Sequence, residues 1–333
     1  MFKCSVAITS ALLLFMICSC GGGGSTVASN SSPSTPAPAP TATPSPSPTP
    51  TPLPTPTPTP AIPAVSHVFI VLLENEGLSN VIGNPAAPFL TSFASQHALA
   101  DNYFANTHPS IGNYLMLTTG NIQTNDDAFA GSFNVDNIAR ALTTAGKTWK
   151  GYMETLPFAG YAGDDVYPYF KHHDPFVYFT DVTSGSQVNN VVPFDQLATD
   201  LSAGTVPNFA FITPNAEDDG HDCPTGGSTG CTMADRITAA DNWVKDNINP
   251  LIQNPALANS VFIIVFDEAL DSDTTNGGGK IPMIMAGAHV KTGFTSTTLY
   301  QHQSTLRLVM DLLQVSDHPG LSATAPGMNE FFQ

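Results

Sequence analysis

Two stretches of continuous apolar residues constrain the fold more than any other feature of this sequence. Residues 67–73 are HVFIVLL, and residues 260–268 are SVFIIVFDE. A strand with no polar alternation is typical of a parallel sheet that is covered by helices on both faces. Shorter apolar runs at 206–213 and 281–287 predict two further strands.

Segments with helical spacing of apolar residues separate these strands. They are residues 85–100, 134–146, 232–248 and 302–315, with Gly146 ending the second helix before a strand from about Thr148, and Pro250 ending the third. This alternation predicts an α/β fold, a three-layer α/β/α sandwich with a mostly parallel central sheet. In such sheets ligands bind outside the carboxyl ends of the strands.

The first 20 residues have the pattern of an export signal. They contain one cation, Lys3, and an apolar run from about Val6 to Ile17, too short for a membrane-spanning helix. The ending ICSC resembles a bacterial lipobox, which predicts that Cys20 is lipidated and becomes the first mature residue. We therefore expect an exported lipoprotein, anchored in a membrane at the cell surface or in the periplasm. Ordinary cleavage and secretion is the alternative.

Residues 21–63 are predicted to be a linker. Between Pro33 and Pro63 there are 14 prolines and no charged residue, so this segment cannot bury a core and favours the polyproline II conformation. The remaining residues, 64–333, are enough for one large α/β domain.

The charge of this domain excludes one class of partner. All 27 acidic residues lie in it, against nine lysines and arginines. Nucleic acid binding needs a basic surface, so we expect none. A phosphate ligand would need local positive charge from a metal ion or a helix N-terminus. The oligomeric state is left open by the sequence.

The domain has two cysteines, Cys223 and Cys231, in the segment CPTGGSTGC. Their spacing and the export signal favour a small disulfide loop formed in an oxidising compartment. Zinc binding by this pair is the less favoured interpretation.

Polar residues follow three of the predicted strands. The first strand is followed by Glu74 and Asn75, the strand at 206–213 by the segment TPNAEDDGHD, and the last of the three by Asp267 and Glu268. Each group alone is ordinary for a loop, but three groups at one edge of a sheet indicate a site. Oxygen ligands with an imidazole suit a divalent cation such as Mg²⁺, Mn²⁺, Ca²⁺ or Zn²⁺.

The segment THPSIGNYLMLTTGN, residues 107–121, offers several hydroxyl groups. Pro109 disfavours helix at the preceding residue and can begin one, which places Ser110 in a first helical turn. Thr118 and Thr119 lie deeper in that helix, where hydroxyls usually bond to the preceding turn, and Gly120 ends it. Ser110 is therefore the best-placed nucleophile; Thr107 is second and would serve as a helix cap.

The sequence from 67 to 121 resembles the opening of the bacterial phosphoesterase family, which includes acid phosphatases and phospholipases C and belongs to the alkaline-phosphatase-like superfamily. The resemblance continues through YMETLP (152–157), KHHDPFVYF (171–179), NFAFITPNAEDDGHDC (208–223), FDE (266–268) and YQHQSTLRLVMDLL (300–313). It implies a metal-dependent phosphoric ester hydrolase, either a phosphatase or a phospholipase C-like phosphodiesterase, that acts on a phosphoester substrate through a phosphoserine.

Carried over by position, the resemblance assigns two sets of residues. It implies that a divalent metal is bound by Glu74, Asn75, Ser110, Asp267 and Glu268, with Asp219 at a polar position that could serve a second metal. It implies that Ser110 is the nucleophile, that Asn113 contacts a phosphoryl oxygen, and that His173, His221 and His302 are proton donors or ligands of a second metal. The sequence departs from the family at Glu76, Gly112 and the HHDP segment.

Three alternatives stay open at this point. The segment GGSTG places Ser228 in a G-x-S-x-G pattern, and Ser228, Asp267 and His302 follow the order of an esterase triad, but no strand precedes that serine. A sulfatase is disfavoured because Ile-Gly-Asn-Tyr follows Ser110. A lipoprotein that binds a ligand without turnover is the non-enzymatic alternative.

Overall fold

The computed structural model describes residues 37, 61–227 and 229–333. The predicted signal peptide, Cys20, most of the predicted linker 21–63 and Ser228 lie outside the described residues. Among the described helices, none has the length and apolar character needed to cross a membrane.

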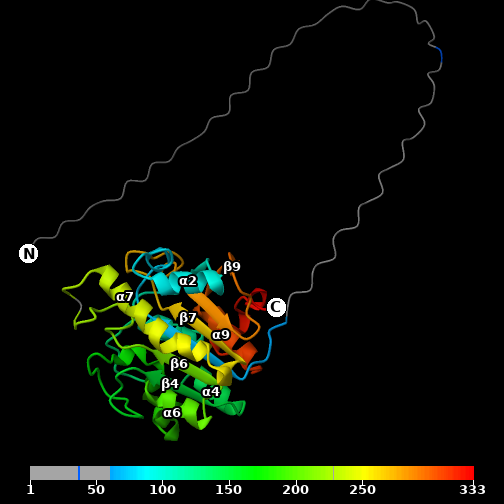
Figure 1. Ribbon diagram of the computed structural model, residues 1–333. Coiled ribbons are helices and arrows are strands. Elements are labelled where there is room, and N and C mark those ends of the chain that lie inside the picture. The colour runs from blue at the N-terminus through cyan, green and yellow to red at the C-terminus, as the bar shows by residue number, and fades with distance from the viewer. Residues whose placement is uncertain (1–36, 38–60, 228) are drawn as a thin grey trace, which may run out of the picture. The chain divides into compact units, whose positions relative to one another are not determined.

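An eight-stranded sheet forms the centre of the described part of the chain (Figure 1). Its spatial order is β5 (Val191–Pro193), β4 (Trp149–Met153), β6 (Phe209–Thr213), β1 (His67–Leu73), β7 (Ser260–Phe266), β8 (Met283–Gly287), β2 (Ala98–Ala100) and β9 (Phe294–Ser296). The strands are parallel except β8, which is antiparallel to both of its neighbours. Two short strands, β3 (Tyr103–Phe104) and β10 (Tyr300–Gln301), form a separate parallel pair. The predicted mostly parallel α/β fold is confirmed.

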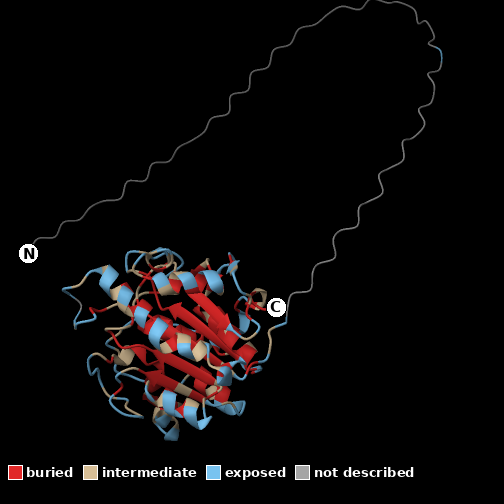
Figure 2. Cartoon of the chain, in the orientation of Figure 1, coloured by how far each residue is buried: buried red, intermediate tan, exposed pale blue. Residues whose placement is uncertain are grey.

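Two groups of helices flank the sheet. The helices are α1 (Leu78–Val81), α2 (Pro88–Gln96), α3 (Ile111–Thr119), α4 (Ile138–Thr144), α5 (Thr180–Thr183), α6 (Gln196–Ala203), α7 (Met233–Trp243), α8 (Asn249–Ile252) and α9 (His302–Leu312). Helix α2 packs against α7, whereas α3 packs against α4 and α9. The two groups cover opposite faces of the sheet, the three-layer arrangement that buries a mostly parallel sheet on both sides. Every residue of β7, and every residue of β1 except His67, is buried, as Figure 2 shows by the red strands between striped helices.

Two element boundaries differ from the prediction. The segment 85–100 is helical only to Gln96, and its last three residues form β2 beside β8. Pro250 does not end the third helix, because α7 continues through a π-helical turn at Val244–Ile248 into α8. Proline is tolerated there because it occupies the first turn of α8, where its missing N–H costs no helical bond.

Candidate active site

Three neighbouring parallel strands bring the predicted polar residues to one edge of the sheet. Strand β1 lies between β6 and β7, and the three run in the same direction. Their carboxyl ends lead into Glu74, Asn75, the segment 214–222, and Asp267 with Glu268. Two backbone hydrogen bonds, each of 2.9 Å, connect these strand ends. The Glu74 N–H donates to the Asp219 carbonyl, and the Asp267 N–H donates to the Leu73 carbonyl.

Ser110 stands at the N-cap of α3 with its side chain turned toward this edge. A serine at this position usually accepts a bond from the first helical turn, but here its hydroxyl caps no backbone group. Instead Ser110 Oγ donates to Glu74 Oε2 at 3.0 Å and lies 3.3 Å from Asn75 Oδ1. The residue is only 4% exposed. The N–H of Ile111, which follows it, bonds the Asp127 carboxylate at 3.1 Å.

The other hydroxyl groups of this segment have structural partners. Thr118 and Thr119 bond the carbonyls of Tyr114 and Leu115, as their depth in the helix predicts. Thr107 does not cap the helix, because Ser110 occupies the N-cap position, and its hydroxyl donates to the His108 carbonyl instead.

Asn75 lies at the centre of the cluster in a left-handed conformation, with φ of 51°. Its N–H donates to Asp267 Oδ1 at 3.0 Å. Its side-chain oxygen faces two further acceptors, Glu74 Oε2 at 2.8 Å and Asp267 Oδ1 at 3.2 Å, and the reversed amide would donate to both and accept from His221 Nε2. An amide oxygen among carboxylate oxygens is favourable only when a cation lies between them. This amide therefore has one orientation suited to a bound cation and another suited to the cation-free protein.

Four buried carboxylates surround this point: Glu74, Asp219, Asp267 and Glu268, each at most 1% exposed. Burial raises the pKa of Glu74 well above its ordinary value, and Asp267 and Asp219 raise it further. Burial also raises the pKa of Asp267 to about 7 and, with the Asp267 charge, that of Glu268 to about 10. The ion pairs that these four groups make within the described residues are to histidines, His173 and His108.

The carboxylates also retain buried oxygen atoms with no hydrogen-bond partner among the described residues. These atoms are Asp219 Oδ2, Asp267 Oδ2 and Glu268 Oε1. A buried acceptor without a partner costs free energy, as does the mutual repulsion of carboxylates in a low-dielectric site. A divalent cation removes both costs, so the residues present fit such an ion. The convergent oxygens of Glu74, Asn75, Ser110 and Asp267 are the donors best placed to hold it.

Two histidines, His173 and His221, lie beside the cluster and differ in their exposure to solvent. His173, in the 3₁₀ turn Lys171–His173, is 5% exposed, with Nε2 3.3 Å from Glu74 Oε1 and Nδ1 3.7 Å from Asp219 Oδ2. His221 is partly exposed, and its Nε2 lies 3.2 Å from the Asn75 amide. Burial lowers the pKa of both imidazoles, and most strongly that of His173. Of the two, His221 is the one that solvent and a substrate can reach.

His302 occupies a different position from the one that proton transfer requires. It is completely buried, its Nε2 lies 2.6 Å from the Asp267 backbone carbonyl, and its Nδ1 lies 3.2 Å from the Tyr103 hydroxyl. Burial lowers its pKa to about 4. Both nitrogens are therefore committed to the protein, and His302 holds the backbone of Asp267 in place.

Asn113 is likewise committed to protein groups. Its Oδ1 accepts from the N–H groups of Asn106 and Thr107, and its Nδ2 donates to the Thr107 carbonyl and to Glu268 Oε2 at 3.1 Å. The phosphoryl contact expected of Asn113 would require one of these bonds to open. Its present contacts fix the loop before Ser110 against Glu268.

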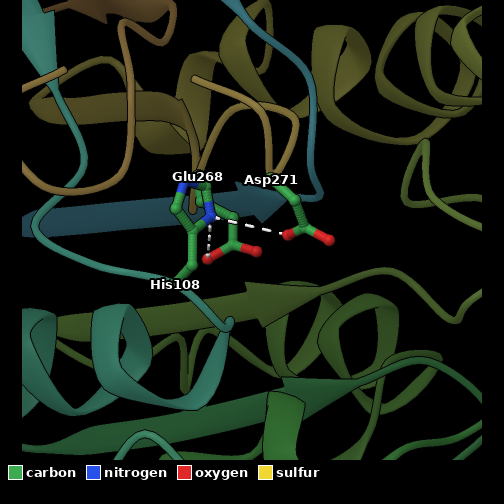
Figure 3. A group of neighbouring side chains, drawn as sticks. All are labelled: His108, Glu268 and Asp271. Atoms are coloured by element: carbon green, nitrogen blue, oxygen red, sulfur yellow. Dashed lines mark ion pairs between the residues drawn. The ribbon is translucent and has the colours of Figure 1, made fainter. Parts of the chain in front are cut away.

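The sequence prediction missed three residues at this edge. The Tyr114 hydroxyl donates to Glu74 Oε1, and its ring stacks on His173 with centroids 5.2 Å apart. His108 lies between two carboxylates here, with Nδ1 3.2 Å from Glu268 Oε2 and 3.7 Å from Asp271 Oδ1 (Figure 3). The spacing of Tyr114 four residues after Ser110, on the same helix face, was the available signal.

The esterase arrangement finds no geometric support. Cys223 and Cys231 form a disulfide, so the segment containing the G-x-S-x-G pattern is a closed loop. His302 contacts the backbone carbonyl of Asp267 and not its carboxylate, whereas a triad acid must hold the imidazole through the carboxylate.

Comparison with known proteins shows the family of this chain. The model of the phosphoesterase family matches residues 83–316. The chain belongs to the phosphoesterase family. It is 31% identical over 277 residues to phosphatidylinositol-3-phosphatase of Mycobacterium tuberculosis, a match that covers 82% of this chain and 84% of that protein. It is also 31% identical over 274 residues to a probable acid phosphatase of Kluyveromyces lactis, a match that covers 77% of this chain and 61% of the yeast protein.

The fold of this phosphoesterase is that of the alkaline phosphatase superfamily. A crystal structure of a superfamily member from Vibrio parahaemolyticus matches with a TM-score of 0.57 and 14% identity, covering 80% of this chain and 72% of the other. Members of the superfamily generally use divalent metals, which agrees with the carboxylate and imidazole groups found here. The protein is a hydrolase that acts on phosphoric esters, as the family match and its phosphatase relatives show.

Proposed function

We propose that this phosphoesterase is a metal-dependent phosphatase in which Ser110 is the nucleophile. The observation that carries the proposal is the convergence of the Ser110 hydroxyl with Glu74 and Asn75 at 3.0 and 3.3 Å, within a buried group of carboxylates at three adjacent strand ends. The residues proposed to hold the cation are Glu74, Asn75, Ser110 and Asp267, with Asp219 and Glu268 at its edges.

The chain's own groups support transfer of a phosphoryl group to serine. When bound, a divalent cation would lower the proton affinity of the serine hydroxyl and neutralise phosphate charge. Ser110 Oγ forms the new bond to phosphorus as the bond to the leaving oxygen breaks, and Glu74 Oε2 gives the hydroxyl proton an acceptor. His221, the more exposed of the two imidazoles, donates a proton from Nε2 to the leaving alcohol. Water then hydrolyses the phosphoserine and regenerates Ser110.

The names of the relatives favour monoesters as substrates. One relative is named a phosphatidylinositol-3-phosphatase and the other an acid phosphatase, and both names denote removal of a terminal phosphate. We propose phosphomonoester hydrolysis as the main activity, and a phospholipase C-like phosphodiesterase activity as the alternative that a diester substrate tests.

A paired substrate and variant experiment tests this function. The metal-loaded protein should hydrolyse p-nitrophenyl phosphate faster than bis-p-nitrophenyl phosphate, and acid quenching should trap phosphate on Ser110, detectable by peptide mass spectrometry. Ser110→Ala should abolish both signals. Thr118→Ala is the matched control, because it removes a hydroxyl of the same helix that bonds only backbone carbonyls. Unchanged turnover in Ser110→Ala would refute the assignment, and bound metal without turnover in the wild type would favour a binding protein.

We also propose export and lipid anchoring through Cys20, which the lipobox-like ending supports. Cys20→Ala should move the protein from the membrane fraction of expressing cells to the soluble fraction. Retention in the membrane fraction would contradict the anchor.

A further inference from the structure

A pocket of about 490 Å³ lies at the same edge of the sheet as the proposed active site. Its walls come from the segments that follow β1, β7 and β2, together with Lys280, which precedes β8. Strand β8 is antiparallel to both neighbours, so its start lies at the edge where the other strands end. This is the edge of an α/β sheet at which ligands bind.

The loop after β7 connects this pocket to the site residues. Ala269, in the pocket wall, directly follows Glu268. The Asp273 carbonyl, in the same wall, accepts from His108 Nε2 at 3.0 Å, and His108 lies two residues before Ser110. The same loop therefore borders both the pocket and the proposed nucleophile.

Two hydrogen bonds hold the walls of the pocket together. The Leu78 N–H donates to the Lys280 carbonyl at 2.9 Å, and the Lys280 N–H donates to Asp273 Oδ2 at 3.2 Å. The other oxygen of that carboxylate accepts from the Thr275 N–H at 3.0 Å. The pocket is thus formed before any ligand enters, which lowers the entropic cost of binding.

The lining combines apolar and polar side chains. Leu78, Ile82 and Leu270 provide partly buried apolar surface, and Asp101 and Lys280 provide charged groups. Small-molecule sites typically have volumes of about 300–1,000 Å³ and join apolar walls to a few polar groups that fix orientation. The size and lining of this pocket have that character.

Asp101 and Lys280 lie side by side and keep hydrogen-bonding capacity for a ligand. Lys280 Nζ donates to Asp101 Oδ2 at 3.4 Å, and the two side chains are 36% and 44% exposed. The ammonium group has two further N–H donors, and Asp101 Oδ1 accepts no hydrogen bond from the described residues. The hydroxyls of Ser79 and Ser272 are likewise unbonded within the described part of the chain. Neighbouring donors and acceptors match the hydroxyls of a polyol, because each hydroxyl both donates and accepts.

The charges of the lining disfavour an anionic ligand. The charged side chains that line the pocket are Asp101, Asp273 and Lys280, two carboxylates against one ammonium group. A second anionic group on a substrate would meet this local negative charge in a chain whose net charge is −17. An uncharged molecule rich in hydroxyls meets no such repulsion and can place its C–H groups on the apolar surface.

We propose that this pocket binds the alcohol part of the phosphoester and selects an uncharged polyol, such as a sugar or a sugar alcohol. This inference rests on the phosphatase function proposed for the chain. Hydroxyls of the polyol bond Asp101 and Lys280, and its carbon chain packs on Leu78 and Ile82. Binding energy from this part of the substrate holds the phosphate in position for Ser110, so it raises kcat as well as lowering KM.

Substrate selectivity of the metal-loaded, full-length protein tests the proposal. Sorbitol 6-phosphate should have a higher kcat/KM than 6-phosphogluconate, which differs from it only by a carboxylate in place of the terminal CH₂OH. Asp101→Ala should lower kcat/KM for sorbitol 6-phosphate by about 10-fold, the effect of one hydrogen bond to a charged group. It should leave kcat/KM for p-nitrophenyl phosphate unchanged, because that leaving group has no further hydroxyl. Asp136→Ala, which removes an exposed carboxylate paired with Arg140 at 3.1 Å, is the matched control and should change neither value.

A second variant blocks the pocket without touching its charges. Ser272→Trp places a large ring in the pocket from an exposed position, and Ser202→Trp on α6 is its control. Ser272→Trp should lower kcat/KM for sorbitol 6-phosphate, while the inhibition constant of inorganic phosphate, which has no alcohol part, stays at the wild-type value. Equal kcat/KM for sorbitol 6-phosphate and 6-phosphogluconate in the wild type would overturn the proposal, as would wild-type selectivity in both pocket variants.

The outcome is separable from that of the proposed function. If Ser110 is phosphorylated and the pocket variants keep the selectivity of the wild type, the pocket assignment falls and the function stands. If the wild type hydrolyses no phosphoester, the function falls, and saturation-transfer NMR with free sorbitol then decides on the pocket. Transfer that is seen in the wild type and lost in Ser272→Trp would support the polyol site, and its absence from the wild type would refute it.

Discussion

Replacing Tyr114 with phenylalanine tests whether Glu74 is held in place for a cation. The Tyr114 hydroxyl donates to Glu74 Oε1, while Ser110 donates to Oε2 of the same carboxylate. Tyr114→Phe keeps the ring that stacks on His173 and leaves Oε1 with only His173 Nε2, at 3.3 Å. A buried hydrogen bond to a charged group contributes about 1.5–3 kcal/mol to stability. Removing a group that orients a metal ligand typically lowers metal affinity by about 10–100-fold.

The matched control is Tyr152→Phe. The Tyr152 hydroxyl, also buried, donates at 2.7 Å to Oδ2 of Asp200, a carboxylate of α6 that is not among the site residues. Urea unfolding of the metal-loaded proteins should show a similar loss of stability in both variants. Chelator competition should show weaker metal binding only in Tyr114→Phe, together with a lower kcat. Equal metal affinities in the two variants would refute the role given to Glu74.

Three further predictions concern the rest of the domain. Burial raises the pKa of Asp174 to about 7, so the folded state keeps a proton that the unfolded state releases, and stability falls as pH rises from about 4 to 7. Asp174→Asn should therefore gain stability relative to the wild type above pH 7, by at most about 4 kcal/mol, in urea titrations at pH 5 and pH 8. Gly112→Ala should lower the melting temperature, since a Cβ there would lie 2.2 Å from Asn125 Oδ1 and 2.5 Å from Thr107 Cγ2, at a cost of about 1–3 kcal/mol. Removing metal with a chelator should destabilise the wild type by about 4 kcal/mol if the cation was present at 1,000 times its dissociation constant, and calorimetry would detect it.

The central sheet could be predicted because burial on both faces leaves a strong pattern in the sequence. After their first residues, His67 and Ser260, strands β1 and β7 are continuous apolar runs. The direction of β8 was harder to predict, although residues 267–282 contain no helix in the structure and a parallel return normally needs one. The three residues of β2 follow α2 so closely that a longer helix and a helix followed by a short strand give the same apolar pattern.

Some residues of the candidate site could likewise be predicted from the sequence, and others could not. Glu74, Asn75, Asp267 and Glu268 could be predicted because each directly follows a strand, and the sheet fixes where strands end. His108 and Asp271 could not, because they come from two loops whose meeting depends on tertiary structure. The role of His302 was equally hidden from sequence, since only the structure shows that its two nitrogens bond Asp267 and Tyr103.

The electrostatics of the chain predict that phosphate binds only after a cation does. The net charge is −17, and the four buried carboxylates of the site find their ionic partners among histidines in the described residues. The first backbone N–H of α3, which could otherwise face an anion, is taken by Asp127. A phosphate dianion would therefore meet repulsion in the metal-free protein. Inorganic phosphate should then bind measurably only after the metal, and calorimetric binding of phosphate to the chelator-treated protein would contradict this order.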